Sequence, residues 1–179
     1  TLPIDALIID KTPLNSLSYD QLMRANALYT FIGDSYHMIN NRQSAFSAYE
    51  YALIFFPESA ATLNNYAYFL AVDGIDLDKA EKMSEIAIKT EPDNATYIDT
   101  YAWVLFKKGD YENALKYQQQ AIEKIGDDLS ADVLEHMGDI YFKCNEPQKA
   151  IEYWEQALKL NAENELLQRK VKQKTYFEK

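Results

Sequence analysis

A pattern of small residues recurs along this chain of 179 residues. Gly33, Ala67, Ala102 and Gly138 lie 34, 35 and 36 residues apart. Each is followed three residues later by Tyr or Leu, and a second set of alanines recurs with a similar period at 45, 80, 114 and 150. Such a period marks proteins whose units bury their apolar faces only by stacking on one another. We therefore expect four stacked copies of one structural unit.

The unit is clearest between Thr96 and Ile122. Apolar residues recur there at spacings of three and four in two runs, which predicts two amphipathic helices. Gly109 can adopt the left-handed conformation that ends the first helix, and Asp110 can cap the second. The sequence of this stretch therefore predicts a helix–turn–helix hairpin.

The pattern resembles the tetratricopeptide repeat (TPR) family, whose unit is a helix–turn–helix of about 34 residues. The family pattern places an aromatic between two alanines of the second helix, where the second and third units here have Ser84 and Gln118. The clearest copies are Tyr29, Ile32, Gly33, Tyr36, Ala45, Tyr49, Ala52 and Pro57 in the first unit, and Leu134, Met137, Gly138, Tyr141, Ala150, Trp154 and Ala157 in the fourth. The resemblance implies an all-α, right-handed α-solenoid of four hairpins, with Trp154 in the core.

The repeats divide the chain into three parts. Residues 18–164 are predicted to form the four repeats, at about 26–59, 60–94, 95–130 and 131–164. A polar ninth helix is expected over 163–176 as the solvating cap that terminal repeats need. Residues 165–179 would form the end of this helix and a basic tail. Residues 1–17 lack the pattern, and we interpret them as an N-terminal arm or the remnant of a preceding unit, with a turn of helix near 4–10 as one option.

Composition excludes several classes of protein. A net charge of −10 argues against nucleic-acid binding, and no run of 18 apolar residues predicts a membrane span. Cys144 is the single cysteine, so no internal disulfide can form. Because the chain starts at a threonine, we expect it to be a fragment of a longer protein. The many Asn, Tyr, Lys and Ile residues suggest a bacterial source, and we place the protein on the periplasmic side of an envelope.

Catalytic and cofactor motifs are missing from the sequence. It contains no phosphate-binding, dinucleotide-binding, zinc-protease or nucleophile-elbow motif, so we predict a non-enzymatic protein with no cofactor and no metal. Asp132, Glu135, His136 and Asp139 share one helical face, which could bind a divalent cation if a second helix added ligands. We favour the interpretation that this is a solvated acidic face over a metal-assisted hydrolase.

The family resemblance implies that a peptide or protein segment binds in the concave groove. The predicted groove residues are Asn64, Tyr68, Asp99, Trp103, Phe106, Lys107, Glu135, Asp139 and Phe142. Trp103 is expected to be open to solvent, and its carboxylate neighbours favour a basic partner. Packing of these aromatics against the next unit is the open alternative. The alternative function is self-association within a larger envelope protein, with a second copy of the chain as partner.

Overall fold

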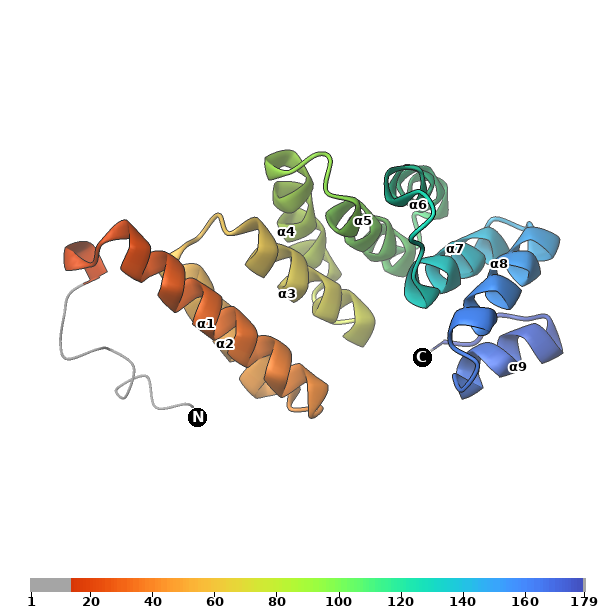
Figure 1. Ribbon diagram of the computed structural model, residues 1–179, viewed down its shortest axis with the longest axis horizontal. Helices are drawn as coiled ribbons and strands as arrows, with labels where there is room; N and C mark the ends of the chain where they lie inside the picture. The colour runs from red at the N-terminus through yellow and green to blue at the C-terminus, as the bar shows by residue number, and fades with distance from the viewer. Residues whose placement is uncertain (1–13, 179) are drawn as a thin grey trace.

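The computed structural model describes residues 14–178, and within this range the secondary structure consists of helices joined by turns, without strands. The turn of helix predicted near 4–10 lies outside the described residues. Figure 1 shows the helices following one another along an arc from α1 to α9. After a short 3-10 helix at Leu14–Ser16, the helices are α1 (Tyr19–Met38), α2 (Arg42–Phe55), α3 (Ala60–Asp73), α4 (Leu77–Thr90), α5 (Ala95–Lys108), α6 (Tyr111–Ile125), α7 (Ala131–Lys143), α8 (Pro147–Leu160) and α9 (Glu165–Gln173).

The helices pair as four hairpins that stack side by side. Within each hairpin α1 packs on α2, α3 on α4, α5 on α6 and α7 on α8. The stacking contacts run mainly from α4 to α5, from α3 to α5 and from α6 to α7, and α9 packs on α8. The predicted α-solenoid with a capping helix is confirmed. The cap is shorter than expected, because Lys174 has a left-handed φ of 51° and ends the helix after Gln173.

Local side-chain chemistry sets where the helices begin and end. Ser18 accepts a hydrogen bond from the Gln21 backbone N–H, and the Gln21 side chain accepts one from the Ser18 N–H, which completes a capping box. Gly109 adopts a φ of +88° and ends α5. Asp110 then caps α6 by accepting from the Asn113 N–H at 3.3 Å. The turn chemistry that the sequence predicts is therefore present in the hairpin of the third repeat.

A glycine facing an aromatic ring forms the centre of the first and fourth hairpins. A Cβ atom added at Gly33 would lie 2.6 Å from Cε1 of Tyr49, and one added at Gly138 would overlap Trp154. Tyr49 and Trp154 are both fully buried, as predicted for Trp154. The missing side chain on the first helix thus lets the ring on the second helix lie against its backbone, and the two helices approach closely.

Truncating Trp154 to alanine should destabilise the protein strongly. The ring is 0% exposed, and its Nε1 donates to Oδ1 of Asp139 at 2.9 Å, so Trp154→Ala leaves both a cavity and a lost hydrogen bond. We expect the free energy of unfolding to fall by about 3–5 kcal/mol, measured by chemical denaturation. Trp154→Phe, which keeps a ring, serves as the milder control. An unchanged melting temperature in Trp154→Ala would contradict this packing.

Candidate functional site

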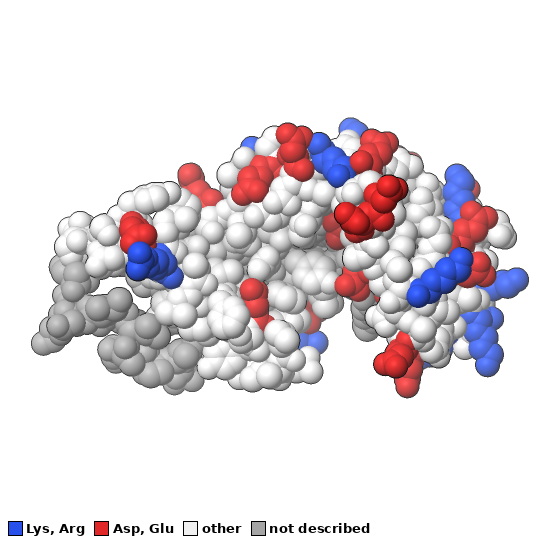
Figure 2. All heavy atoms as spheres, in the orientation of Figure 1, with Lys and Arg blue, Asp and Glu red and all other residues white. Residues whose placement is uncertain are grey.

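An open cleft lies between the first helices of the four repeats. Its volume is about 400 Å³, and it brings together three of the predicted groove residues, Asn64, Tyr68 and Asp99. Figure 2 shows the molecule in the orientation of Figure 1. Acidic side chains lie near the middle of the visible face, and several basic side chains gather towards the C-terminal end. The cleft is lined by Asp34, Asn64, Asn65, Tyr68, Phe69, Thr96, Asp99, Thr100, Ile125, Ser130, Asp132, Val133 and His136.

Hydrogen bonds hold two of the cleft carboxylates in place. Asp34 accepts from the Tyr49 hydroxyl at 2.5 Å and from the Asn65 side chain at 3.1 Å. Asp99 accepts from the Gln118 amide at 2.5 Å, and its other oxygen lies 3.2 Å from Nδ1 of His136. These contacts fix the carboxylates before any ligand arrives, which lowers the ordering cost of binding.

Polar groups of the cleft differ in exposure. Oδ1 of Asn64 is buried but has no hydrogen-bond partner among the described residues, so it keeps an unused capacity to accept a hydrogen bond. Asp132 is exposed at the rim. Burial raises the pKa of Tyr68 to about 12, and the carboxylates of Asp132, Asp99 and Glu135 add to the rise. The phenol therefore stays protonated at neutral pH and can donate a hydrogen bond.

Trp103 is not open to solvent, and that expectation was wrong. Its side chain is 4% exposed, and its ring stacks between Phe106 at 4.8 Å and His136 at 4.1 Å. Tyr176 and Phe177 join it around a small cavity of about 50 Å³. The ring is therefore covered by Phe106 of its own helix, by His136 of the fourth repeat and by the segment that follows α9, so the alternative of packing against the next unit describes Trp103. Sequence periodicity could not show the part of this cover that comes from the segment after α9, because that segment is more than seventy residues away.

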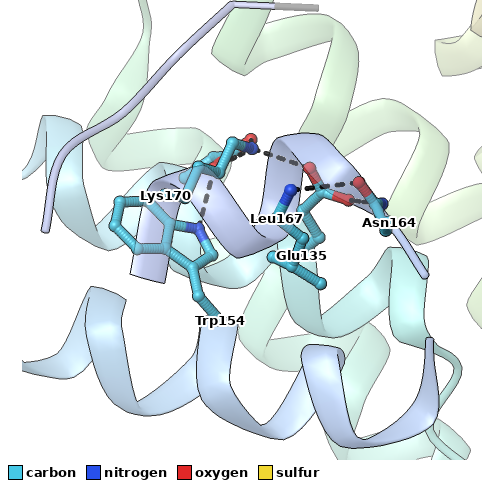
Figure 3. Close-up of polar contacts among 6 residues, drawn as sticks. Glu135, Trp154, Asn164, Leu167 and Lys170 are labelled. Carbon is cyan, nitrogen blue, oxygen red and sulfur yellow. Dashed lines mark hydrogen bonds and ion pairs between the residues drawn. The ribbon is translucent and has the colours of Figure 1, made fainter. Parts of the chain in front are cut away.

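Glu135 and Asp139 are buried beneath α9 and do not flank an open groove. Nζ of Lys170 lies 2.7 Å from Oε1 of Glu135 and 2.7 Å from each carboxylate oxygen of Asp139 (Figure 3). Asn164 also donates to Glu135 at 3.4 Å. Lys170 is 0% exposed, so a single buried ammonium group of the chain itself pairs with both acids.

The titratable side chains on the acidic face of α7 contact different partners. Glu135 and Asp139 bind Lys170, His136 faces Asp99, and Asp132 remains exposed. The expectation of a solvated face was therefore wrong for Glu135 and Asp139, because α9 covers them. Sequence reasoning missed Lys170. The available signal was its spacing of three from Leu167, which places a lysine on the apolar face of a polar helix.

Two further predicted groove residues contact the segment after α9. Nζ of Lys107 lies 2.9 Å from Oε1 of Glu178. Phe142 packs against Trp154 and Tyr176, with ring centroids 5.7 and 6.5 Å away. The predicted set thus splits into an open part lined by Asn64, Tyr68 and Asp99 and a covered part around Trp103.

Within the described range, no helix is both long and apolar enough to cross a bilayer.

Comparison with known proteins agrees with the repeat pattern. Residues 95–123 and 131–164 each match a model of the tetratricopeptide repeat. PilF of Pseudomonas aeruginosa is 22% identical with a TM-score of 0.70, over 86% of this chain and 68% of PilF. A MamA structure is 19% identical with a TM-score of 0.61, over 84% of this chain and 80% of MamA. MamA from Desulfovibrio magneticus is 18% identical with a TM-score of 0.63, over 84% and 83%. At these identities the likeness shows the fold.

Removing the Lys170 ammonium should destabilise the protein in a pH-dependent way. Lys170→Met leaves two buried carboxylates without their cation, and we expect a loss of about 3–5 kcal/mol in the free energy of unfolding near neutral pH. Burial raises the pKa of Asp139, Glu135 adds to the rise, and Lys170 opposes it. Without Lys170 that pKa rises further, so the folded variant binds protons more tightly than the unfolded chain.

The loss should therefore shrink as the pH is lowered from about 7 to about 5, because protonation stabilises the folded variant. Urea denaturation of variant and wild type at both pH values measures this difference. Lys172→Met is the matched control, since Lys172 is exposed on the same helix. Equal losses at both pH values would contradict the coupling between Lys170 and the buried acids.

Proposed function

We propose that this chain, which belongs to the tetratricopeptide repeat family, binds a peptide segment of a partner protein in its open cleft. Repeats of this family form protein-interaction scaffolds and are generally not enzymes. The observation that carries the proposal is the cleft of about 400 Å³ between the first helices, with fixed polar groups on its walls. Concave sites with a few oriented polar groups are the usual form of a binding site.

The amides of the cleft suit the backbone of an extended segment. Asn64 and Asn65 are consecutive on α3, and Oδ1 of Asn64 lacks a partner within residues 14–178. If the Asn64 side chain turns toward the cleft, a backbone N–H of the ligand can donate to this oxygen whatever the ligand's side chains are. Tyr68 and Phe69, half-buried beside these amides, add apolar contact area. The partner's backbone thus supplies affinity that does not depend on its sequence.

The charge of the cleft favours a basic partner. Asp34, Asp99 and Asp132 line it, and no Lys or Arg is among its lining residues in the described chain. Attraction between opposite charges speeds the encounter of the cleft with a basic segment and disfavours other partners. Added salt weakens this attraction. We therefore infer that the bound segment carries Lys or Arg opposite these carboxylates.

A random peptide library selected against the full chain should enrich Lys and Arg. Binding of an enriched peptide, measured by fluorescence anisotropy, should weaken about tenfold or more in Asp132→Lys, a change of about 1.4 kcal/mol. Asp128→Lys makes the same charge change at an exposed position that does not line the cleft. If both variants bind the peptide equally well, the proposed cleft is not the binding site.

Self-association is the second candidate, and the exposed face of α1 favours it. Leu28, Phe31 and Met38 are 47%, 68% and 83% exposed on this helix, and their spacing places them on one face. Between Arg24 and Asp34 the helix carries no charged residue. Contiguous exposed apolar surface of this kind usually marks a protein interface. We propose a second copy of the chain, packed on the same face of its own α1, as the partner.

Sedimentation velocity over a range of protein concentrations tests this candidate. Wild type should shift from monomer to dimer as concentration rises, and Phe31→Glu should remain monomeric because the dimer would bury its charge. Glu50→Gln alters an exposed residue on α2 and should dimerise like wild type. A wild-type chain that stays monomeric at every concentration removes self-association from consideration.

A further inference from the structure

The segment after α9 lies against the first helices of the third and fourth repeats. It comprises residues 174–178, here called the tail, and Figure 1 places this end of the chain near α7. The Tyr176 ring packs on Phe106 and Phe142, with centroids 5.9 and 6.5 Å away, and Nζ of Lys143 lies 4.6 Å from its centre. The tail thus lies on two predicted groove residues, Phe106 and Phe142, in the way that a bound peptide would.

We propose that the surface under the tail is a second docking site, and that the tail is its internal competitor. The partner that fits is a segment with an aromatic residue followed two positions later by a carboxylate, which is the spacing of Tyr176 and Glu178. This inference rests on the proposed binding of peptides by the first helices, but it concerns different charged residues and the opposite charge, although Tyr68 and His136 border both sites. The open cleft lined by Asp132 is not part of it.

The chemistry of the surface under the tail determines this partner. Phe106, Phe142 and Trp103 provide the apolar seat for the aromatic ring. Lys107 binds the Glu178 carboxylate at 2.9 Å, and Lys143 lies over the Tyr176 ring. A cation beside an aromatic seat selects an aromatic residue with a nearby acid. Such a segment carries the opposite charge to the ligand of the open cleft.

The tail is held weakly compared with the helix that precedes it. Glu178 is 67% exposed, and an ion pair this open to solvent stabilises little. Tyr176 and Phe177 are only half-buried, whereas Leu167 and Lys170 of α9 are fully buried. The tail can therefore detach while α9 stays in place over the fourth repeat.

The fit of the tail is also incomplete. Nε1 of Trp103 is buried without a hydrogen-bond partner among the described residues, and it borders the cavity of about 50 Å³ beside Tyr176. An unpaired buried donor costs free energy. A ligand that brings an acceptor to this N–H therefore binds the site more favourably than the tail does. A partner segment can thus displace the tail even though the tail, being tethered, competes at high effective concentration.

The test compares the wild type with a tail-disarmed variant that keeps α9, Tyr176→Ser/Phe177→Ser/Glu178→Ser. The probe is a fluorescein-labelled peptide with the sequence of residues 175–178, which keeps the aromatic residue and the carboxylate but carries no lysine that could bind the open cleft, and binding is measured by anisotropy. We expect the variant to bind the peptide about tenfold more tightly than wild type, because the competitor is removed. Acrylamide quenching of tryptophan should rise in the variant and fall again when the peptide is added.

A charge swap separates docking from a merely structural role. Lys107→Glu in the disarmed variant should abolish binding of the peptide, and a peptide with Lys in place of the glutamate should restore it. Asp132→Lys should leave binding unchanged, so failure at the open cleft and failure here are distinguishable. If circular dichroism shows full helicity but the disarmed variant binds the peptide no better than wild type, or not at all, the proposal is overturned.

Discussion

One buried ammonium group organises the C-terminal half of the molecule. Lys170 reaches from α9 to two carboxylates of α7, and one of these also accepts from the Trp154 indole. A charge without water is tolerated only when its partners are close and hydrogen-bonded, so this contact admits a single position for α9. The position of α9 in turn directs the tail across the aromatic residues of α5 and α7. Lys170 thus sets where the tail begins, and the tail in turn covers the aromatics.

The sequence predicted the elements of the fold because they depend on nearby residues. Helix periodicity, the turn at Gly109 and the cap at Asp110 each involve neighbours within a few positions. The burial of Trp154 followed from the small residues around it, since a ring between two alanines has to face the partner helix. No local argument of this kind predicted the burial of Trp103. Its cover includes Tyr176, and helical periodicity shows that a face is apolar without showing what lies on it.

The candidate site illustrates the same limit. Asn64, Tyr68 and Asp99 do meet in one cleft, because their helices stack in sequence order. Lys170 escaped prediction because it pairs 31 and 35 residues away, across a face that its helix shares with Leu167. The polarity of α9 predicted a solvating cap, and its fully buried Leu167 and Lys170 make the inner face of this cap part of the core.

The exposed face of α1 has a consequence for how the molecule comes apart. In a solenoid each repeat is stabilised only by its neighbours, so local opening free energies differ along the chain. The fourth hairpin has α9 packed over it with Leu167 and Lys170 fully buried, whereas α1 keeps exposed apolar side chains within the described residues. Among the described repeats, local opening should therefore cost less free energy at α1 and α2 than at the fourth hairpin. The aromatic seat under the tail would then keep its shape while the first hairpin opens and closes.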